Sequence, residues 1–393
     1  MNHKVNIFWF FFIFPLQIFA QVSITGTVTD AINSQSIPYA TVYVNGTTTG
    51  TITNISGQYT LERVIPPCEI VISHISYETV VIEFEQQSET NIDVVLKPRD
   101  VILDDVEVID KNMRESNLSQ FKKRFLGADY WGKGAKIEND SVLVFHREKV
   151  SEVESGRLVS GLLAADTSST LFVVNTKGPL LVNLPLLGYK LHINLMHYTE
   201  LQTGNDTDYE FHTLGYFYFQ PEDNASKRKT NRFERKRLEA YYNSDRHFCR
   251  SLFSDRLLEN GYMVRYDAIN PKIVIKPNTR DYIIFPNINN SEIEPGTNEL
   301  DYHIIRTDSE VKIVGLKNKN YRIKYYEKNN APINLRERGE FPSSTSQIYF
   351  LKDTCTIRAD GSRPDNSIMF GPAIGNKRVG AMLPYDFQPG NEK

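Results

Sequence analysis

The side chains best suited to recognise a ligand gather between residues 235 and 250. Tyrosine and arginine offer flat apolar surface with hydrogen-bonding ends, so this cluster would suit an anionic or glycan ligand. A solvated helix face with i,i+4 pairs, such as Arg235 with Glu239, gives the same pattern. The candidate binding residues are Arg235, Arg237, Tyr241, Tyr242, Arg246, His247 and Arg250, with Lys236 between them.

Zinc chemistry is a second candidate. His197 and Glu200 form a His-x-x-Glu pattern, and His303 follows at a workable separation. Zinc binds nitrogen and oxygen donors of this kind in an open site. The motif is short and often arises by chance, and His197 ends an alternating strand, so we expect it at the surface. No metal and no other cofactor is predicted.

Nucleophilic chemistry has little support in the sequence. There is no Gly-x-Ser-x-Gly motif, and Cys68, Cys249 and Cys355 are odd in number and far apart. His247 and Cys249 would point about 200° apart on a helix, so they cannot act as a pair. We expect all three cysteines to be small packing residues. Two glycosidase carboxylates would leave no sequence pattern, so that chemistry stays open.

The amino terminus predicts export. A short start containing Lys4 precedes an uncharged apolar run over residues 5–20, and a small residue, Ala20, ends it. The run is shorter than the ~20 apolar residues of a spanning helix, and Pro15 lies inside it. Residues 1–20 therefore indicate a signal peptide cleaved after Ala20, with no transmembrane helix afterwards. The 48 acidic residues outnumber the 45 basic ones, which argues against nucleic-acid binding.

Residues 21–98 alternate between apolar and polar side chains in short runs. "VSITGTVTD", "YATVYVNG", "EIVISHI", "TVVIEF" and "NIDVVL" each predict a strand with one buried face. The glycines of "GTTTG", at Gly46 and Gly50, have no helix after them and no Lys-Ser/Thr ending, so they indicate turns rather than a phosphate loop. The pattern favours a β-sandwich of about seven strands.

Several short motifs in this region carry a resemblance. They are Gly26-Thr27-Val28 with Asp30, residues 37–42, Gly46-Thr47, Gly50-Thr51, Thr53-Asn54, residues 56–59 and residues 73–77. This region resembles the carboxypeptidase-like regulatory domain, with Asn54 and Ser76 departing from its usual pattern. The resemblance implies a transthyretin-like or Ig-like seven-strand sandwich in an exported protein of the Bacteroidetes. That module is an appendage of true zinc carboxypeptidases, so it brings no catalytic domain with it.

A charged linker over residues 99–116 leads to a second domain over residues 117–393. Leu118, Phe121 and Phe125 predict a helix that ends near Gly127. Two further helices are expected between Phe233 and Gly261, the second capped by Ser244, and strand-like runs surround them. Residues 178–195, 235–253, 260–264 and 382–389 resemble the partner domain that follows the regulatory module in exported Bacteroidetes proteins.

The sequence thus predicts a mainly β protein with a strand-rich α+β second domain of two or three helices. We expect an exported, non-catalytic protein of the cell envelope, in the periplasm, at the outer membrane or outside the cell. It would be a binding or adaptor module for an envelope protein or a polysaccharide. The alternative is a metal-dependent or carboxylate-based hydrolase of peptide or glycan.

Overall fold

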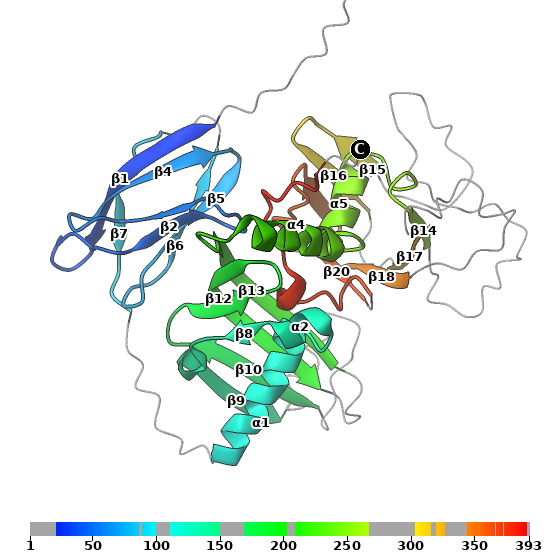
Figure 1. Ribbon diagram of the computed structural model, residues 1–393, viewed down its shortest axis with the longest axis horizontal. Coiled ribbons are helices and arrows are strands. Elements are labelled where there is room, and N and C mark those ends of the chain that lie inside the picture. The colour runs from blue at the N-terminus through cyan, green and yellow to red at the C-terminus, as the bar shows by residue number, and fades with distance from the viewer. Residues whose placement is uncertain are drawn as a thin grey trace, which may run out of the picture.

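The computed structural model describes most of the chain. The described residues are 21–85, 89–99, 111–149, 169–202, 209–266, 303–315, 320–326, 344–365, 367–371 and 373–390. The signal peptide predicted at residues 1–20, and much of the predicted linker, lie outside them. Figure 1 shows a sandwich in blue, a middle sheet in green with helices in cyan, and a third part running to red. The chain is mainly β, as predicted.

Two small sheets form the sandwich. One has the order β4-β1-β7, with β1 antiparallel to β4 and parallel to β7. The other has the order β3-β2-β5-β6 and is antiparallel throughout. Alternate side chains of the strands other than β3 enter one core, among them Ile24, Val28 and Ile72, as the period-two pattern predicts. The strands are β1 (Val22–Asp30), β2 (Thr41–Val44), β3 (Gly50–Ile52), β4 (Gln58–Val64), β5 (Cys68–Ser73), β6 (Val80–Phe84) and β7 (Val94–Leu96).

The middle sheet is built on one long strand, β12 (Tyr189–Gln202). One side of β12 pairs along its length with β13 (Tyr209–Pro221), while the other side pairs with β11 (Leu180–Leu184) and β10 (Thr170–Thr176). The remaining strands are β8 (Lys136–Ile137) and β9 (Leu143–Lys149). Three helical segments, α1 (Lys111–Phe121), η1 (Lys122–Leu126) and α2 (Tyr130–Gly134), accompany this sheet (Figure 1). The predicted helix stripe is confirmed, because Phe121 and Phe125 are buried in this core.

Two helices follow β13: α4 (Lys227–Tyr241), whose Ala240 and Tyr241 pack into the middle core, and α5 (Asp245–Phe253), which begins the third part. Ser244 caps α5 as predicted, since its Oγ accepts a hydrogen bond from the His247 amide at 3.1 Å. The prediction that this helix extends to Gly261 is wrong, because α5 ends at Phe253. Ser254 bonds back to the Arg250 carbonyl at 2.7 Å, and Asp255, at φ 58°, turns the chain away.

Two further sheets pack with α5 around a separate core. The first has the order β14-β17-β18-β20 and the second the order β15-β16-β19. Phe248 and Leu252 of α5 pack into this core with Tyr262 and Ile313. The strands are β14 (Tyr262–Tyr266), β15 (His303–Arg306), β16 (Glu310–Val314), β17 (Asn320–Tyr325), β18 (Ser344–Phe350), β19 (Thr354–Arg358) and β20 (Ile368–Phe370).

The "GTTTG" stretch joins the sandwich to the middle sheet. We call residues 45–50 the docking turn. The Gly46 amide donates to the Phe217 carbonyl at 2.7 Å, and the Phe219 amide donates to the Thr47 carbonyl at 3.0 Å. The turn therefore binds the open edge of β13 by main-chain hydrogen bonds, as an added strand would. Asn45 Oδ1 completes the pairing by accepting from the Phe217 amide at 2.9 Å.

The C-terminal segment, residues 378–390, touches all three parts. Its 3₁₀ turn, η5 (Val379–Ala381), is buried, and Leu383 packs into the middle core. The Tyr385 amide donates to the Gly46 carbonyl at 2.6 Å, and Asp386 accepts from the Thr48 amide at 3.0 Å. Two arginines of α5 bind its carbonyls, as described next. The segment therefore ties the sandwich, the middle sheet and α5 together.

Candidate functional site

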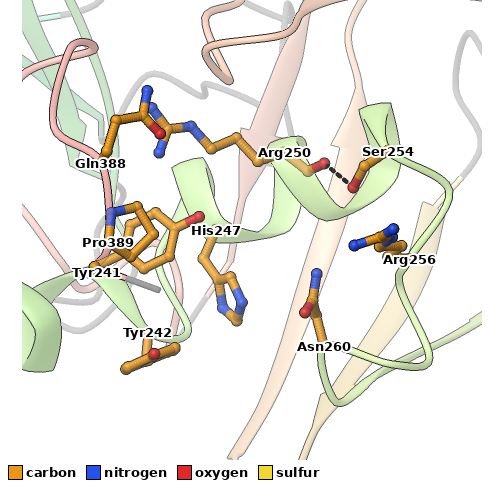
Figure 2. Close-up of a pocket in the computed structure, with 10 residues that line it drawn as sticks. Tyr241, Tyr242, His247, Arg250, Ser254, Arg256, Asn260, Gln388 and Pro389 are labelled. Atoms are coloured by element: carbon orange, nitrogen blue, oxygen red, sulfur yellow. Dashed lines mark hydrogen bonds between the residues drawn. The ribbon is translucent and has the colours of Figure 1, made fainter. Parts of the chain in front are cut away.

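The predicted cluster borders a cavity of about 470 Å³, which we call the α4–α5 pocket (Figure 2). The end of α4, the length of α5 and the last residues of the C-terminal segment form its walls. Tyr241, Tyr242, His247 and Arg250 are the predicted residues that line it. The others that line it are Ser254, Arg256, Asn260, Gln388, Pro389 and Gly390.

Arg250 uses its guanidinium to hold the chain itself. Its Nε, Nη1 and Nη2 donate to the carbonyls of Asp360, Phe387 and Tyr385, at 3.0, 2.9 and 2.9 Å. Three donors in a planar fork are thus engaged by backbone oxygens. Arg250 forms a wall of the pocket and fixes the C-terminal segment against α5, so its main interactions are structural.

The other predicted arginines do not line the pocket. Arg246 is buried, donates to the Pro384 carbonyl and lies over the Tyr385 ring at 4.4 Å. Arg237 donates to the Leu187 carbonyl at 2.8 Å and stacks on Tyr189 at 4.0 Å. Arg235 is exposed on α4. Of the seven predicted residues, four line the pocket, two make internal contacts and Arg235 is exposed.

His247 lies at the pocket wall with a fixed tautomer. Its Nδ1 is 3.2 Å from the Asn243 amide, which can only donate, so Nδ1 accepts and the proton is on Nε2. The Tyr262 hydroxyl, 2.9 Å away, must then donate to Nδ1 as well. The ring packs against Tyr241 at 5.0 Å. These contacts hold the imidazole in one orientation.

Lys377 holds the end of α4 that carries the two tyrosines of the pocket. Its Nζ donates to the carbonyls of Ala240, at 3.0 Å, and of Tyr242, at the end of α4. Burial lowers the pKa of Lys377 to about 8. A cation at a helix C-terminus satisfies the last carbonyls and their partial negative charge. This interaction fixes the residues that carry Tyr241 and Tyr242.

Sequence reasoning missed Lys377 and the pocket residues beyond α5. Arg256 is exposed and lies 3.6 Å from Glu259, and Asn260 donates to Ser251 at 3.0 Å. Gln388 comes from the C-terminal segment, which has no periodic pattern. Only the resemblance over residues 382–389 pointed to this segment, and it gave no role.

The proposed zinc ligands occupy different surroundings. His197 is exposed, whereas Glu200 is fully buried on the opposite face of β12. Glu200 accepts from Gln120 at 3.0 Å and lies 3.4 Å from Arg124 Nε. His303 begins β15, in another sheet, and its side chain lies outside the described residues. Within the described residues, no three His, Cys, Asp or Glu side chains gather as a metal site.

The three cysteines are free. Cys249 and Cys355 are buried in the third core, and Cys68 is half-buried in β5. Burial raises the pKa of Cys249 to about 11 and the pKa of Cys68 and Cys355 to about 12. The thiols therefore stay protonated at neutral pH.

Comparison with known families and structures agrees with the sandwich. Residues 24–108 match the CarboxypepD_reg-like domain, a non-catalytic Ig-like module. A search of curated proteins gives no match. In the part of the chain that the structure describes, no helix has the length and apolar character needed to cross a membrane.

Similarity to solved structures is slight. A 9R-lipoxygenase from Cyanothece PCC8801 is 7% identical, with 61% of this chain and 48% of that chain covered and a TM-score of 0.18. A protein of unknown function from Bacteroides fragilis NCTC 9343 is 12% identical, with 51% of this chain and 95% of that chain covered and a TM-score of 0.17. This chain thus spans about half the length of the lipoxygenase.

Proposed function

We propose that this protein is an exported, non-catalytic binding protein of the cell envelope. The match of residues 24–108 to a non-catalytic module supports a binding or adaptor role. The sandwich is held to the middle sheet by the docking turn, so the module and the rest of the chain work as one unit. The signal-peptide pattern of residues 1–20 supports export.

The ligand that best fits the α4–α5 pocket is a glycan. The observation that carries this is the pairing of tyrosine rings with planar polar side chains around one cavity. Tyr241 and Tyr242 provide apolar surface, while Asn260, Gln388 and Arg256 provide amide and guanidinium groups at its rim. Sugars present both C–H faces and hydroxyls, so they can use both kinds of group.

Binding to envelope polysaccharide tests this proposal. The chain from residue 21 onward is immobilised, and the retention of purified envelope glycans is measured at increasing salt. Tyr242→Ala is expected to lower affinity about tenfold or more, because it removes ring surface from the wall. Tyr130→Ala, an exposed tyrosine on α2 that does not line this pocket, is the matched control and should bind normally.

Two outcomes would refute the proposal. The first is that the intact chain retains no envelope glycan. The second is that Tyr242→Ala and Tyr130→Ala bind alike. A protein partner recovered at fixed stoichiometry, without glycan, would make the chain a protein adaptor instead.

A further inference from the structure

A second cavity lies where the sandwich meets the middle sheet. We call it the seam cleft; its volume is about 370 Å³. One wall comes from β2, β5 and the turn after β5, and the other from β11, β12 and the residues before β11. Neither part of the molecule makes this cleft alone. Clefts at such junctions are common ligand sites.

The walls of the seam cleft are uncharged and largely apolar. Ile75 contributes from the sandwich, and Pro179 and Leu181 contribute from the middle sheet. No Lys, Arg, Asp or Glu is among the described residues that line it. A charged ligand would lose its water here without gaining an ion pair, which is costly. The cleft therefore favours a neutral group.

The floor of the cleft is fixed by hydrogen bonds that cross the seam. Asn194 of β12 is buried, and its Nδ2 donates to the Tyr43 hydroxyl at 2.7 Å. Asn194 Oδ1 accepts from Ser73 at 2.7 Å. These groups satisfy one another, so the floor is preorganised and has little need of a ligand.

Two histidines face this cleft from opposite sides of the seam. His74 Nδ1 accepts from the Ser76 amide at 3.2 Å, and His192 Nε2 lies 3.0 Å from Gln220 Oε1. Each ring thus has one nitrogen that bonds to none of the described residues. Burial lowers the pKa of both His74 and His192, so neutral rings are favoured. They can supply one or two hydrogen bonds to a neutral ligand.

The mouth of the cleft carries two exposed apolar side chains. Tyr39 is 68% exposed and Ile75 is 64% exposed. Tyr39 also has φ 61°, a left-handed conformation that costs a bulky residue about 1–2 kcal/mol. Strained residues of this kind cluster at active sites and ligand clamps.

We propose that the seam cleft binds an aromatic side chain with one polar group, tyrosine or tryptophan, from a polypeptide partner. An apolar cavity of ~150 Å³ holds a benzene molecule, so this cleft has room for a phenol or indole ring and adjoining backbone. A free ring would leave Tyr39 and Ile75 in water. A flanking polypeptide would cover them, as the surroundings of an interface anchor do. This site is separate from the α4–α5 pocket.

The test uses capped tripeptides and the chain from residue 21 onward. Binding of glycyl-tyrosyl-glycine, glycyl-alanyl-glycine and free phenol is followed by NMR chemical shifts and calorimetry. The tyrosine peptide is expected to shift resonances around the cleft and to bind about fivefold or more tighter than phenol. The alanine peptide is expected to show no saturable binding.

Two variants locate the site, one paired with a positional control and the other with a measurement of stability. Ile75→Trp fills the mouth and is expected to lower the affinity for the tyrosine peptide at least about tenfold. Ile55→Trp, at an isoleucine that is 79% exposed in another turn of the sandwich, should bind as the native chain does. Tyr39→Asn removes the ring from the mouth of the cleft, so it should weaken binding. Because asparagine adopts the left-handed conformation more readily than tyrosine, the unfolding midpoint should stay equal or rise.

Three results would overturn the proposal. One is no saturable binding of the tyrosine peptide. Another is equal loss of binding in Ile75→Trp and Ile55→Trp. A third is phenol binding as tightly as the peptide, which would make the cleft a small-molecule site. None of these results bears on glycan binding at the α4–α5 pocket.

Discussion

Arg250 has interactions within the chain that the sequence did not predict. Its type and its neighbours indicated either contact with an anionic or glycan ligand or a solvated helix face. In the structure its three donors bind carbonyls of Asp360, Phe387 and Tyr385, all more than a hundred residues away along the chain. Sequence spacing predicts helix faces but not partners of this kind, because backbone carbonyls occur at every residue.

Replacing Arg250 with lysine tests its structural role. Lysine keeps the charge but cannot reach three carbonyls in a plane, so about two charge-assisted hydrogen bonds are lost. The free energy of unfolding is expected to fall by about 2–4 kcal/mol in urea denaturation. Arg235→Lys, on the exposed face of α4, should stay within about 0.5 kcal/mol of the native chain. Equal stability of the two variants would contradict the assigned role.

The lowered pKa of Lys377 predicts that the stability of the protein changes with alkaline pH. Its pKa is about 8 in the folded protein, against an ordinary value of 10.5. Between these values the unfolded chain binds a proton that the folded protein has lost, so stability rises as pH rises through this window. Relative to Lys377→Met, the native chain should gain on the order of 3 kcal/mol from pH 8 to 10.5. Urea denaturation of both proteins across this range gives the comparison, and a constant difference would refute it.

At the scale of elements, much of the fold was predictable. The period-two runs gave the strands of the sandwich, and Ser244 marked the start of α5, because these signals are local. The docking turn was predicted only as a turn. Its pairing with β13 depends on residues such as Phe217, which are distant in sequence. Domain boundaries stay a prediction, although the described part of the second domain holds two separate cores.

Gly46 of the docking turn predicts that a side chain at this position weakens the contact between the sandwich and the rest of the chain. Gly46 has φ 72°, and a side chain there would strike the Tyr385 ring. Gly46→Ala should therefore weaken docking, with a loss of about 1–3 kcal/mol. Hydrogen exchange at Phe217, Phe219 and Tyr385 should speed up, while β1 and β12 stay protected. Gly390→Ala, where a new Cβ meets nothing within 4 Å, is the control and should change none of these rates.

At the scale of the whole molecule, we expect the C-terminal segment to couple the unfolding of the separate cores. It contacts the docking turn, the middle core and both arginines of α5. Deleting residues 379–393 should therefore separate one calorimetric transition into two or more, because the coupling between cores is lost. The native chain is expected to unfold in fewer steps than the deletion variant. Identical calorimetric profiles would show that the segment does not couple the cores.

The contact between the docking turn and the C-terminal segment also determines the order in which these parts can fold during synthesis. A ribosome makes the sandwich well before the segment around Tyr385. The sandwich can fold early, since its core uses only its own residues. The contacts of Gly46 and Thr48 with this segment cannot form until Tyr385 and Asp386 have been made. During synthesis the docking turn on the edge of β13 therefore lacks its contacts with Tyr385 and Asp386. A chaperone that covers exposed strand edges would matter most in this interval.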